Sequence, residues 1–172
     1  RPSVLINGAG GNNPKATTDD EFYQEAAGVK DFFQLDAEGL RQVFDLNFHG
    51  ALLTTQVFAR DMIGLPGAGV INISSMSAYR PLTKVLAYSG AKAALQNLTM
   101  WLATYFAPVG LRVNAIAPGF FVTNQNRDML YDKEGKPTPR TEKILRATPM
   151  GRFGEPEELL GTLLYLVSPQ AS

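Results

Sequence analysis

Tyr88 and Lys92 are the residues whose types and spacing first suggest chemistry. They stand four apart, so on a helix they would share one face, about one turn from each other. A lysine ammonium beside a phenol favours the phenolate, so we expect the pKa of Tyr88 to fall below its usual value of about 10. Such a tyrosine could transfer a proton near neutral pH. The pair alone is a weak signal, because many solvated helices carry one.

Ser75 strengthens this interpretation. It stands thirteen residues before Tyr88, just after the apolar run Val70–Ile73, which predicts a buried strand. Open α/β sheets bind their ligands at the carboxyl ends of parallel strands, so Ser75 is predicted to lie at a ligand site. Ser74 is the competing serine; the spacing favours Ser75, and we expect Ser74 to face the sheet.

The elements that must position these residues can be predicted from the pattern of apolar positions. Three short apolar runs bounded by glycine or proline predict strands buried on both faces: Val4–Ile6, Val70–Ile73 and Leu111–Ala117. Apolar residues at three- and four-residue spacings predict one helix from about Asp36, which suits an N-cap, to about Ile63, and another over 87–107. Strands that alternate with long helices require right-handed crossovers and a parallel sheet. The predicted fold class is α/β.

Two longer stretches interrupt this alternation. Residues 12–35 are polar and too long for a plain connection between a strand and a helix. Residues 123–149 predict two short helices around an exposed turn at Lys133–Pro137. Loops of this length are usually lids or binding loops, so we expect 123–150 to form a substrate lid within one domain spanning 1–172. Glu155–Glu158 predicts a helix start.

Composition narrows the class of protein. Hydrophobic residues make up 45% and charged residues 19%, which is typical of a globular chain. Lys+Arg and Asp+Glu number 16 each, which argues against a nucleic-acid or anionic-membrane partner. The absence of cysteine excludes a disulfide scaffold and cysteine catalysis. We expect no metal site, no membrane partner and a cytoplasmic protein.

Further motifs surround Ser75, Tyr88 and Lys92 in a definite order. Asn7-Gly8-Ala9-Gly10 follows the first predicted strand, Asn47 lies in the first long helix, and Pro118–Thr123 follows the third strand. In this order and spacing the motifs resemble those of the short-chain dehydrogenase/reductase family over nearly the whole chain. One departure is Gly8, which stands where the family's Asn-Asn-Ala-Gly element has its second asparagine.

The resemblance implies hydride transfer between NAD(P)(H) and an alcohol/ketone pair, with Asn47, Ser75, Tyr88 and Lys92 as catalytic residues. In reduction, Ser75 and Tyr88 would donate hydrogen bonds to the carbonyl oxygen, and Tyr88 would deliver the proton. Lys92 would keep that proton labile and hold the nicotinamide ribose. Asn47 would link Lys92 to solvent through a water; the alternative is that it merely kinks its helix. The implied cofactor contacts are Asn7, Ala9, Gly10, Tyr88, Lys92, Pro118, Gly119, Phe121 and Thr123.

The resemblance also implies a doubly wound, Rossmann-like parallel sheet that is incomplete at both ends. The glycine-rich phosphate turn and the residue that selects NAD or NADP would precede Asn7, and a further strand would follow Ser172. The choice between NAD and NADP therefore stays open, and NAD is favoured by resemblance only. A homodimer or homotetramer built on the helices 36–63 and 87–107 is expected.

The segment Asn124-Gln125-Asn126-Arg127 bears on the substrate. Amides and a guanidinium suit a hydroxylated, carboxylated molecule, because arginine binds carboxylates in a bidentate manner. Together, the segments Gly10–Pro14, Phe120–Arg127 and Thr148–Glu157 resemble a branch of the family that interconverts D-fructuronate and D-mannonate. We hypothesise that Arg127 or Arg152 holds the carboxylate of such a sugar acid, with Asn124 as a further contact.

Other classes of function stay open beside this one. Within the enzymes, the alternatives are another sugar or polyol dehydrogenase and a 3-oxoacyl-type reductase. A different class is a non-catalytic module for cofactor binding or oligomerisation. His49, the only histidine, is expected in packing or an interface rather than in catalysis, and no Gly-x-Ser-x-Gly elbow supports a hydrolase.

Overall fold

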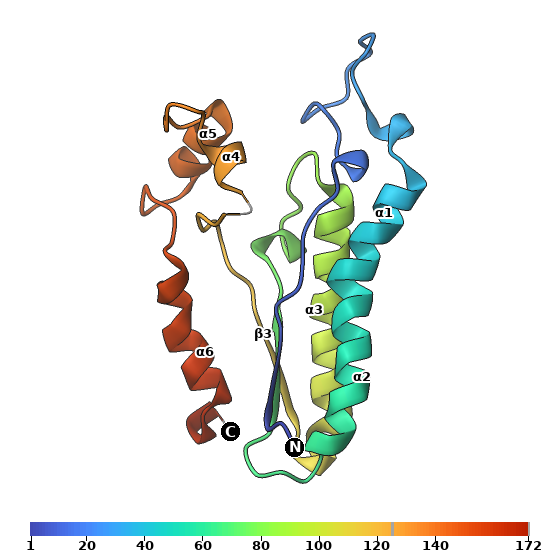
Figure 1. The fold of residues 1–172 in the computed structure, drawn as a ribbon, viewed down its shortest axis with the longest axis vertical. Helices are drawn as coiled ribbons and strands as arrows, with labels where there is room; N and C mark the ends of the chain where they lie inside the picture. The colour runs from blue at the N-terminus through green and yellow to red at the C-terminus, as the bar shows by residue number, and fades with distance from the viewer. Residues whose placement is uncertain (125, 172) are drawn as a thin grey trace. The chain divides into compact units, whose positions relative to one another are not determined.

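The computed structural model describes residues 1–124 and 126–171, and the chain forms two compact units. The first unit comprises residues 1–117 together with the chain from Tyr165 onward. The second unit comprises Pro118–Leu164. Figure 1 shows the elements of each unit. Within the described residues, no helix combines the length and apolar character needed to cross a membrane.

A three-stranded parallel sheet forms the centre of the first unit. Its strands are β1 (Val4–Asn7), β2 (Gly69–Ile73) and β3 (Arg112–Ile116), in the spatial order β1-β2-β3. Gly69 of β2 pairs with Val4 on one side and Arg112 on the other. The three predicted strands and the α/β class are thereby confirmed.

The prediction that all three strands are buried on both faces is wrong for β1. Ile6 of β1 is 46% exposed, whereas Val70 and Ile71 of β2 are fully buried. Within the described chain, β1 and β3 each have β2 as their only neighbouring strand, yet Val113 and Ile116 of β3 stay buried. Ile6 is therefore exposed because its face of β1 is not covered by packed side chains. An apolar run does not show from its sequence whether both of its faces are covered.

The helix predicted from Asp36 to Ile63 begins and ends as expected but is not one α-helix. It consists of α1 (Ala37–Phe44), a π-helical turn (Asp45–His49) and α2 (Gly50–Met62). The Asp36 carboxylate caps α1 by accepting a hydrogen bond from the N–H of Gly39 at 2.6 Å. In the π turn the Gly50 N–H donates to the Asp45 carbonyl five residues back.

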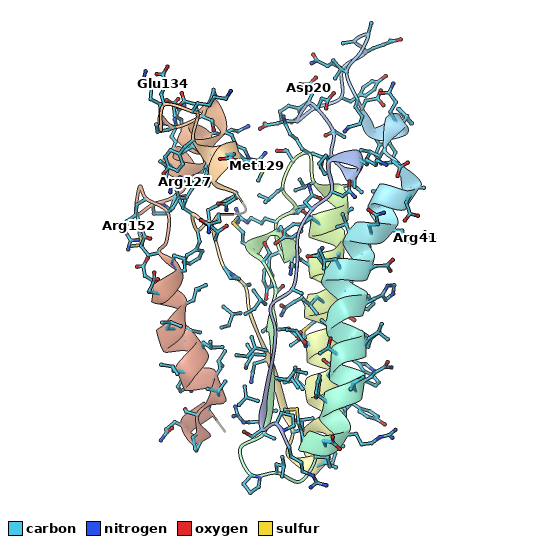
Figure 2. All side chains as sticks on the ribbon, viewed as in Figure 1. Asp20, Arg41, Arg127, Met129, Glu134 and Arg152 are labelled. Atoms are coloured by element: carbon cyan, nitrogen blue, oxygen red, sulfur yellow. The ribbon has the colours of Figure 1, made fainter. Side chains whose placement is uncertain are left out.

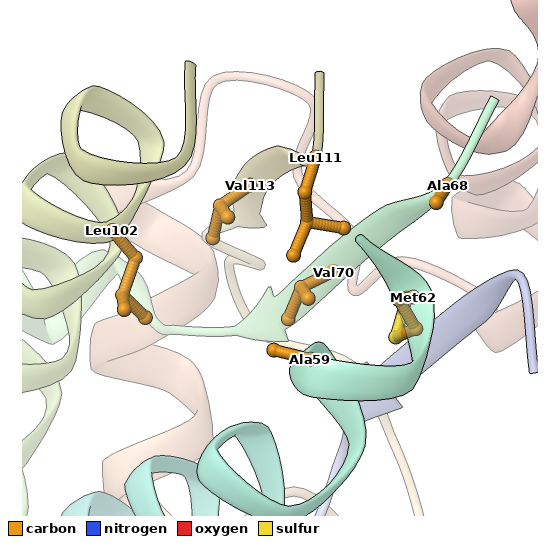
Figure 3. Close-up of a cluster of buried hydrophobic side chains, with 7 residues drawn as sticks. All are labelled: Ala59, Met62, Ala68, Val70, Leu102, Leu111 and Val113. Atoms are coloured by element: carbon orange, nitrogen blue, oxygen red, sulfur yellow. The ribbon is translucent and has the colours of Figure 1, made fainter. Parts of the chain in front are cut away.

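The second long helix, α3 (Leu86–Phe106), lies beside α2 on the same face of the sheet (Figure 1). It ends in a 3-10 turn (Ala107–Val109), and Gly110 follows with a φ of 73°. Figure 3 shows the apolar cluster between these helices and the sheet, to which α2, α3, β2 and β3 all contribute. Its buried members are Ala59, Met62, Ala68, Val70, Leu102, Leu111 and Val113.

A buried chain of amides and hydroxyls links the carboxyl ends of β1 and β2 to both helices. Asn7 Nδ2 donates to Asn72 Oδ1 at 2.8 Å and to Thr55 Oγ1 at 3.0 Å, and Asn72 Nδ2 donates to Thr99 Oγ1 at 2.9 Å. Each threonine hydroxyl donates to the carbonyl four residues earlier in its own helix. Because every link is paired, the network fixes strands and helices at the end of the sheet that carries the candidate site.

The second unit contains the two short helices predicted around an exposed turn, α4 (Arg127–Leu130) and α5 (Pro139–Ala147). A 3-10 turn (Pro156–Leu159) follows and leads into α6 (Leu160–Val167), which confirms the predicted helix start. In the first unit, the Arg112 guanidinium donates to the carbonyl of Leu166 at 2.8 Å. The remaining 3-10 turns are Pro14–Ala16, Phe32–Gln34, Met76–Ala78 and Pro169–Ala171.

Candidate active site

Ser75 and Tyr88 meet at the carboxyl end of β2, in the first unit. Ser75 follows β2 and caps the turn Met76–Ala78, where its Oγ accepts a hydrogen bond from the Ser77 N–H at 3.2 Å. The Ser75 side chain also hydrogen-bonds Tyr88. The predicted ligand site at this end of the sheet therefore holds Ser75 and Tyr88 as hydrogen-bond partners. Ser74 is buried, and its hydroxyl donates to the Lys92 carbonyl at 3.5 Å.

The expected lowering of the Tyr88 pKa is wrong in this structure. Burial raises the pKa of Tyr88 above its ordinary value of 10.0, and the hydrogen bond from Ser75 only partly opposes this. The four-residue spacing predicts an ammonium close enough to the phenol to lower its pKa. Lys92 Nζ lies 5.6 Å from the centroid of the Tyr88 ring and donates to the carbonyl of Ile73 instead. Loss of hydration outweighs a charge held at that distance.

Lys92 is a buried lysine. Its side chain is 3% exposed, and its Nζ donates to the Ile73 carbonyl at 2.8 Å. Burial lowers the pKa of Lys92 to about 8, because the ammonium loses its hydration without gaining a carboxylate. An ammonium has three donors, so this bond leaves Lys92 able to donate to further oxygens.

Asn47 lies at the centre of the π turn, and its side chain does more than shape the helix. Asn47 Nδ2 donates to the carbonyls of Val43 at 2.8 Å and Gly11 at 2.7 Å. Its Oδ1 accepts a hydrogen bond from the Gly11 N–H at 3.1 Å. Asn47 therefore fastens the loop after β1 to the helix, as a fully buried two-way contact. The proposed water link from Asn47 to Lys92 stays a prediction.

Gly10 is the point where Asn47 and Lys92 converge. A Cβ at Gly10 would lie 2.9 Å from Asn47 Oδ1 and 3.1 Å from Lys92 Nζ, both tighter than ordinary contacts. Gly8, two residues earlier, would place a Cβ 3.9 Å from its nearest neighbour, an Ile73 carbon. The loop can accept a side chain at Gly8 without disturbing the site but cannot do so at Gly10.

We expect Gly10→Ala to reduce kcat/KM roughly 10- to 100-fold, because it would displace Lys92, a predicted catalytic residue, by a few tenths of an ångström or more. Gly8→Ala is the matched control and should stay close to wild type. Steady-state kinetics on the full-length protein, with thermal unfolding to verify folding, measures both. Equal activity of the two variants would show that Gly10 does not set the position of Lys92.

Four of the predicted cofactor residues, Pro118, Gly119, Phe121 and Thr123, lie in the loop that begins the second unit. Phe121 pairs with Gly154 in a parallel bridge, and a Cβ on Gly154 would lie 2.3 Å from the Phe121 ring. Asn126 closes the loop: its Nδ2 donates to the Phe121 carbonyl at 2.8 Å, and its Oδ1 accepts from the Thr123 N–H at 2.9 Å. Sequence reasoning missed Gly154 and Asn126 as positioning residues.

Arg127 and Arg152 lie on separate segments of the second unit, as Figure 2 shows. Arg152 already binds a carboxylate of this chain: its two terminal nitrogens contact the two oxygens of Glu158 at 2.7 and 2.8 Å. The Arg152 guanidinium holds the pKa of Glu158 at about 2, well below its usual range. Asn124 is exposed beside α4, and Gln125 lies outside the described residues.

The structure also bears on the predictions about His49 and about metal binding. His49 Nδ1 lies 2.7 Å from Asp45 Oδ1 on an exposed face of the π turn. Over residues 1–124 and 126–171, no group of three or more His, Cys, Asp and Glu side chains is arranged to hold a metal ion.

Known proteins resemble this chain in both sequence and structure. A family model described as enoyl-(acyl carrier protein) reductase matches residues 21–172. An uncharacterized oxidoreductase of Haemophilus influenzae is 63% identical over 98% of this chain and 60% of its own length. The uncharacterized oxidoreductase UxuB of Bacillus subtilis is 55% identical over 98% of this chain and 61% of its own length. The chain thus spans about three fifths of the length of these relatives.

Among solved structures, a crystal structure from Haemophilus influenzae, reported as a proposed D-mannonate oxidoreductase with bound NAD, is 63% identical. It matches with a TM-score of 0.94 over 99% of this chain and 61% of that chain. The match confirms that the parallel sheet and the helices of this chain have a Rossmann-like arrangement. Together with the family match and the grouping of Ser75, Tyr88 and Lys92, it shows that the chain belongs to the short-chain dehydrogenase/reductase family.

Proposed function

We propose that the protein is an NAD(P)-dependent oxidoreductase that interconverts a ketone and an alcohol at the carboxyl end of β2. The observation that carries the proposal is the meeting of Ser75, Tyr88 and Lys92: two side chains that are hydrogen-bond partners and one buried ammonium. Reduction of a carbonyl needs hydrogen-bond donors where negative charge develops and a group that gives up a proton. These side chains supply both.

The N–H donors of Lys92 suit the ribose of a dinucleotide cofactor. Lys92 Nζ donates one hydrogen bond to the Ile73 carbonyl, and its other two N–H groups can donate to a pair of ribose hydroxyls. Gly10 has no side chain, which lets Lys92 Nζ and Asn47 Oδ1 approach the loop after β1 more closely than any other residue there would allow. Asn7 fits less directly, because its amide is committed to Asn72 and Thr55. NAD is favoured over NADP because the Haemophilus structure contains NAD.

When bound, the nicotinamide supplies or accepts the hydride. A phenol is protonated at neutral pH at its ordinary pKa of 10.0, and burial raises the pKa of Tyr88 further, so Tyr88 holds the proton that a reduced carbonyl oxygen needs. The Ser77 N–H occupies an acceptor position on Ser75 Oγ, which leaves the Ser75 hydroxyl as a donor toward Tyr88 or a substrate oxygen. Lys92, held by the Ile73 carbonyl, would orient the ribose. It would also return a proton to Tyr88 from solvent, through Asn47 and a water.

We propose D-fructuronate and D-mannonate as the substrate pair. The name of the Haemophilus structure supports this choice, and the guanidinium of the exposed Arg127 suits a carboxylate. Between the two arginines considered for the substrate carboxylate, Arg127 is the better candidate, because Glu158 occupies the guanidinium of Arg152. Another sugar or polyol dehydrogenase and a 3-oxoacyl-type reductase are the alternatives within the enzyme class.

A substrate panel on the full-length protein, with NADH and NADPH in parallel, tests this proposal. We expect D-fructuronate to be reduced with the highest kcat/KM and an uncharged ketose to be reduced poorly. Arg127→Met should lower kcat/KM for D-fructuronate roughly 10- to 100-fold, the value of a charged hydrogen bond, and leave the uncharged ketose unchanged. Arg152→Met is the control. Retention of wild-type efficiency by Arg127→Met would clear Arg127 of this role, and preference for a 3-oxoacyl substrate would overturn the substrate assignment.

We also propose a homodimer or homotetramer. Large apolar side chains stand exposed along α2 and α3, among them Leu53, Val57, Trp101 and Tyr105, each more than half exposed. Trp101 and Tyr105 stack with their ring centroids 4.7 Å apart. Such a surface favours burial against a second copy. Light scattering on the full-length protein should give the mass of two or four chains, and a monomer would contradict the proposal.

A further inference from the structure

Lys84 has an unusual backbone conformation for its residue type. Among the described residues, six glycines have positive φ, as glycine can without strain. Lys84, with a φ of 71°, is the one non-glycine residue that does so. A side chain makes this left-handed region unfavourable, so the surroundings must hold Lys84 in place. The strain lies in the connection between Ser75 and Tyr88, four residues before the tyrosine.

Both ends of Lys84 bind the same short segment. Its carbonyl accepts a hydrogen bond from the Thr18 N–H at 3.1 Å, and its Nζ donates to the Asp19 carbonyl at 2.5 Å. Asp19 is itself anchored, because its N–H donates to the Lys30 carbonyl at 2.9 Å and its carboxylate accepts from the Lys30 N–H at 2.7 Å. The lysine side chain therefore offsets the strain with a bond that glycine could not make.

The contact between Lys84 and Asp19 joins two loops that follow the carboxyl ends of neighbouring parallel strands. Segment 12–35 follows β1, and the connection 74–85 follows β2. The second loop is also tied to α3, since the Leu82 N–H donates to Ser89 Oγ at 3.2 Å. Lys84 thus links the polar loop after β1 to the segment that sets the start of the helix carrying Tyr88.

We propose that Lys84 is a positioning residue. Its two hydrogen bonds, to Thr18 and Asp19, hold the connection 74–85 and the start of α3 in the geometry that aligns Tyr88 with Ser75. The inference rests on the proposed function, because it concerns the same site. A residue that merely fills a left-handed turn would be replaced best by glycine. A residue whose side chain positions the loop would not be.

Two substitutions in the full-length protein separate these roles. Lys84→Met removes the bond to Asp19 and keeps the strain, whereas Lys84→Gly removes both. We expect both variants to lose roughly 10- to 100-fold in kcat with the KM for the cofactor unchanged, as misalignment of reacting groups predicts. Lys84→Gly should nevertheless unfold at a higher temperature than Lys84→Met. The matched control is Lys30→Met, which removes a 2.7 Å bond from a lysine to the Pro14 carbonyl within the same loop.

Hydrogen exchange gives a readout that does not depend on turnover. Amides of residues 79–88 should exchange faster in both Lys84 variants than in Lys30→Met or wild type. Wild-type kcat and exchange in Lys84→Gly would overturn the inference. If the wild-type protein reduces no carbonyl substrate, the proposed function fails, and the exchange rates still decide whether Lys84 holds the loop.

Discussion

Tyr88→Phe is expected to lower kcat for carbonyl reduction by about 100- to 10,000-fold, the range for loss of a general acid. The substitution removes only the hydroxyl that contacts Ser75 and leaves the half-buried ring in place. Folding should therefore be preserved, and the thermal midpoint should stay within a few degrees of wild type. Stopped-flow or steady-state measurement of NADH oxidation with D-fructuronate gives the rate.

Tyr79→Phe is the matched control for this experiment. Tyr79 lies in the same connection between β2 and α3 but is 65% exposed, so loss of its hydroxyl should leave the rate unchanged. Full carbonyl reduction by Tyr88→Phe would disprove the mechanism. Because burial raises the pKa of Tyr88 above 10.0, we also expect no loss of the wild-type reduction rate from titration of Tyr88 below that pH.

Lys92→Met should have opposite effects on activity and stability. Activity should fall at least about 100-fold, because the proposed function assigns to this ammonium the orientation of the ribose and the support of Tyr88. Stability at pH 7 should rise. The shift of the Lys92 pKa from 10.5 to about 8 corresponds to about 3 kcal/mol of lost hydration. Loss of the hydrogen bond to the Ile73 carbonyl lowers the free energy of unfolding by about 1 kcal/mol, so the net gain in stability should be about 2 kcal/mol.

The pH dependence of this stability difference follows from the direction of the shift. Between about pH 8 and 10.5 the unfolded chain binds the Lys92 proton and the folded chain does not, so wild-type stability rises with pH across that window. Below pH 8 the full penalty is present. The advantage of Lys92→Met should therefore be largest at neutral pH and shrink toward pH 10.5. Denaturant unfolding at several pH values measures it, with Lys133→Met, a change at an exposed lysine, as control. A constant difference across pH would mean that Lys92 is not the source.

The sequence alone was sufficient to predict the strands and long helices and to single out candidate residues for the site. Apolar periodicity located the strands and the long helices within a residue or two, because burial of one face imposes a regular spacing. Residue types and spacing singled out Ser75, Tyr88 and Lys92, and the structure brings them together. The π turn within the first helix was not predicted, because the buried residues across it, Val43, Asn47 and Ala51, keep a four-residue spacing that an α-helix also allows.

Only the tertiary structure decided the electrostatics of the site and the burial of the first strand. The pKa of Tyr88 depends on hydration and on the distance to Lys92 Nζ, and neither is encoded in a four-residue spacing. The same holds for Gly10, Gly154 and Lys84, whose roles arise from atoms far away in the chain. Local sequence determines which side chains are available and on which element each stands. Long-range packing determines their solvation, their partners and the strain at Lys84, because these quantities belong to pairs of segments rather than to either one.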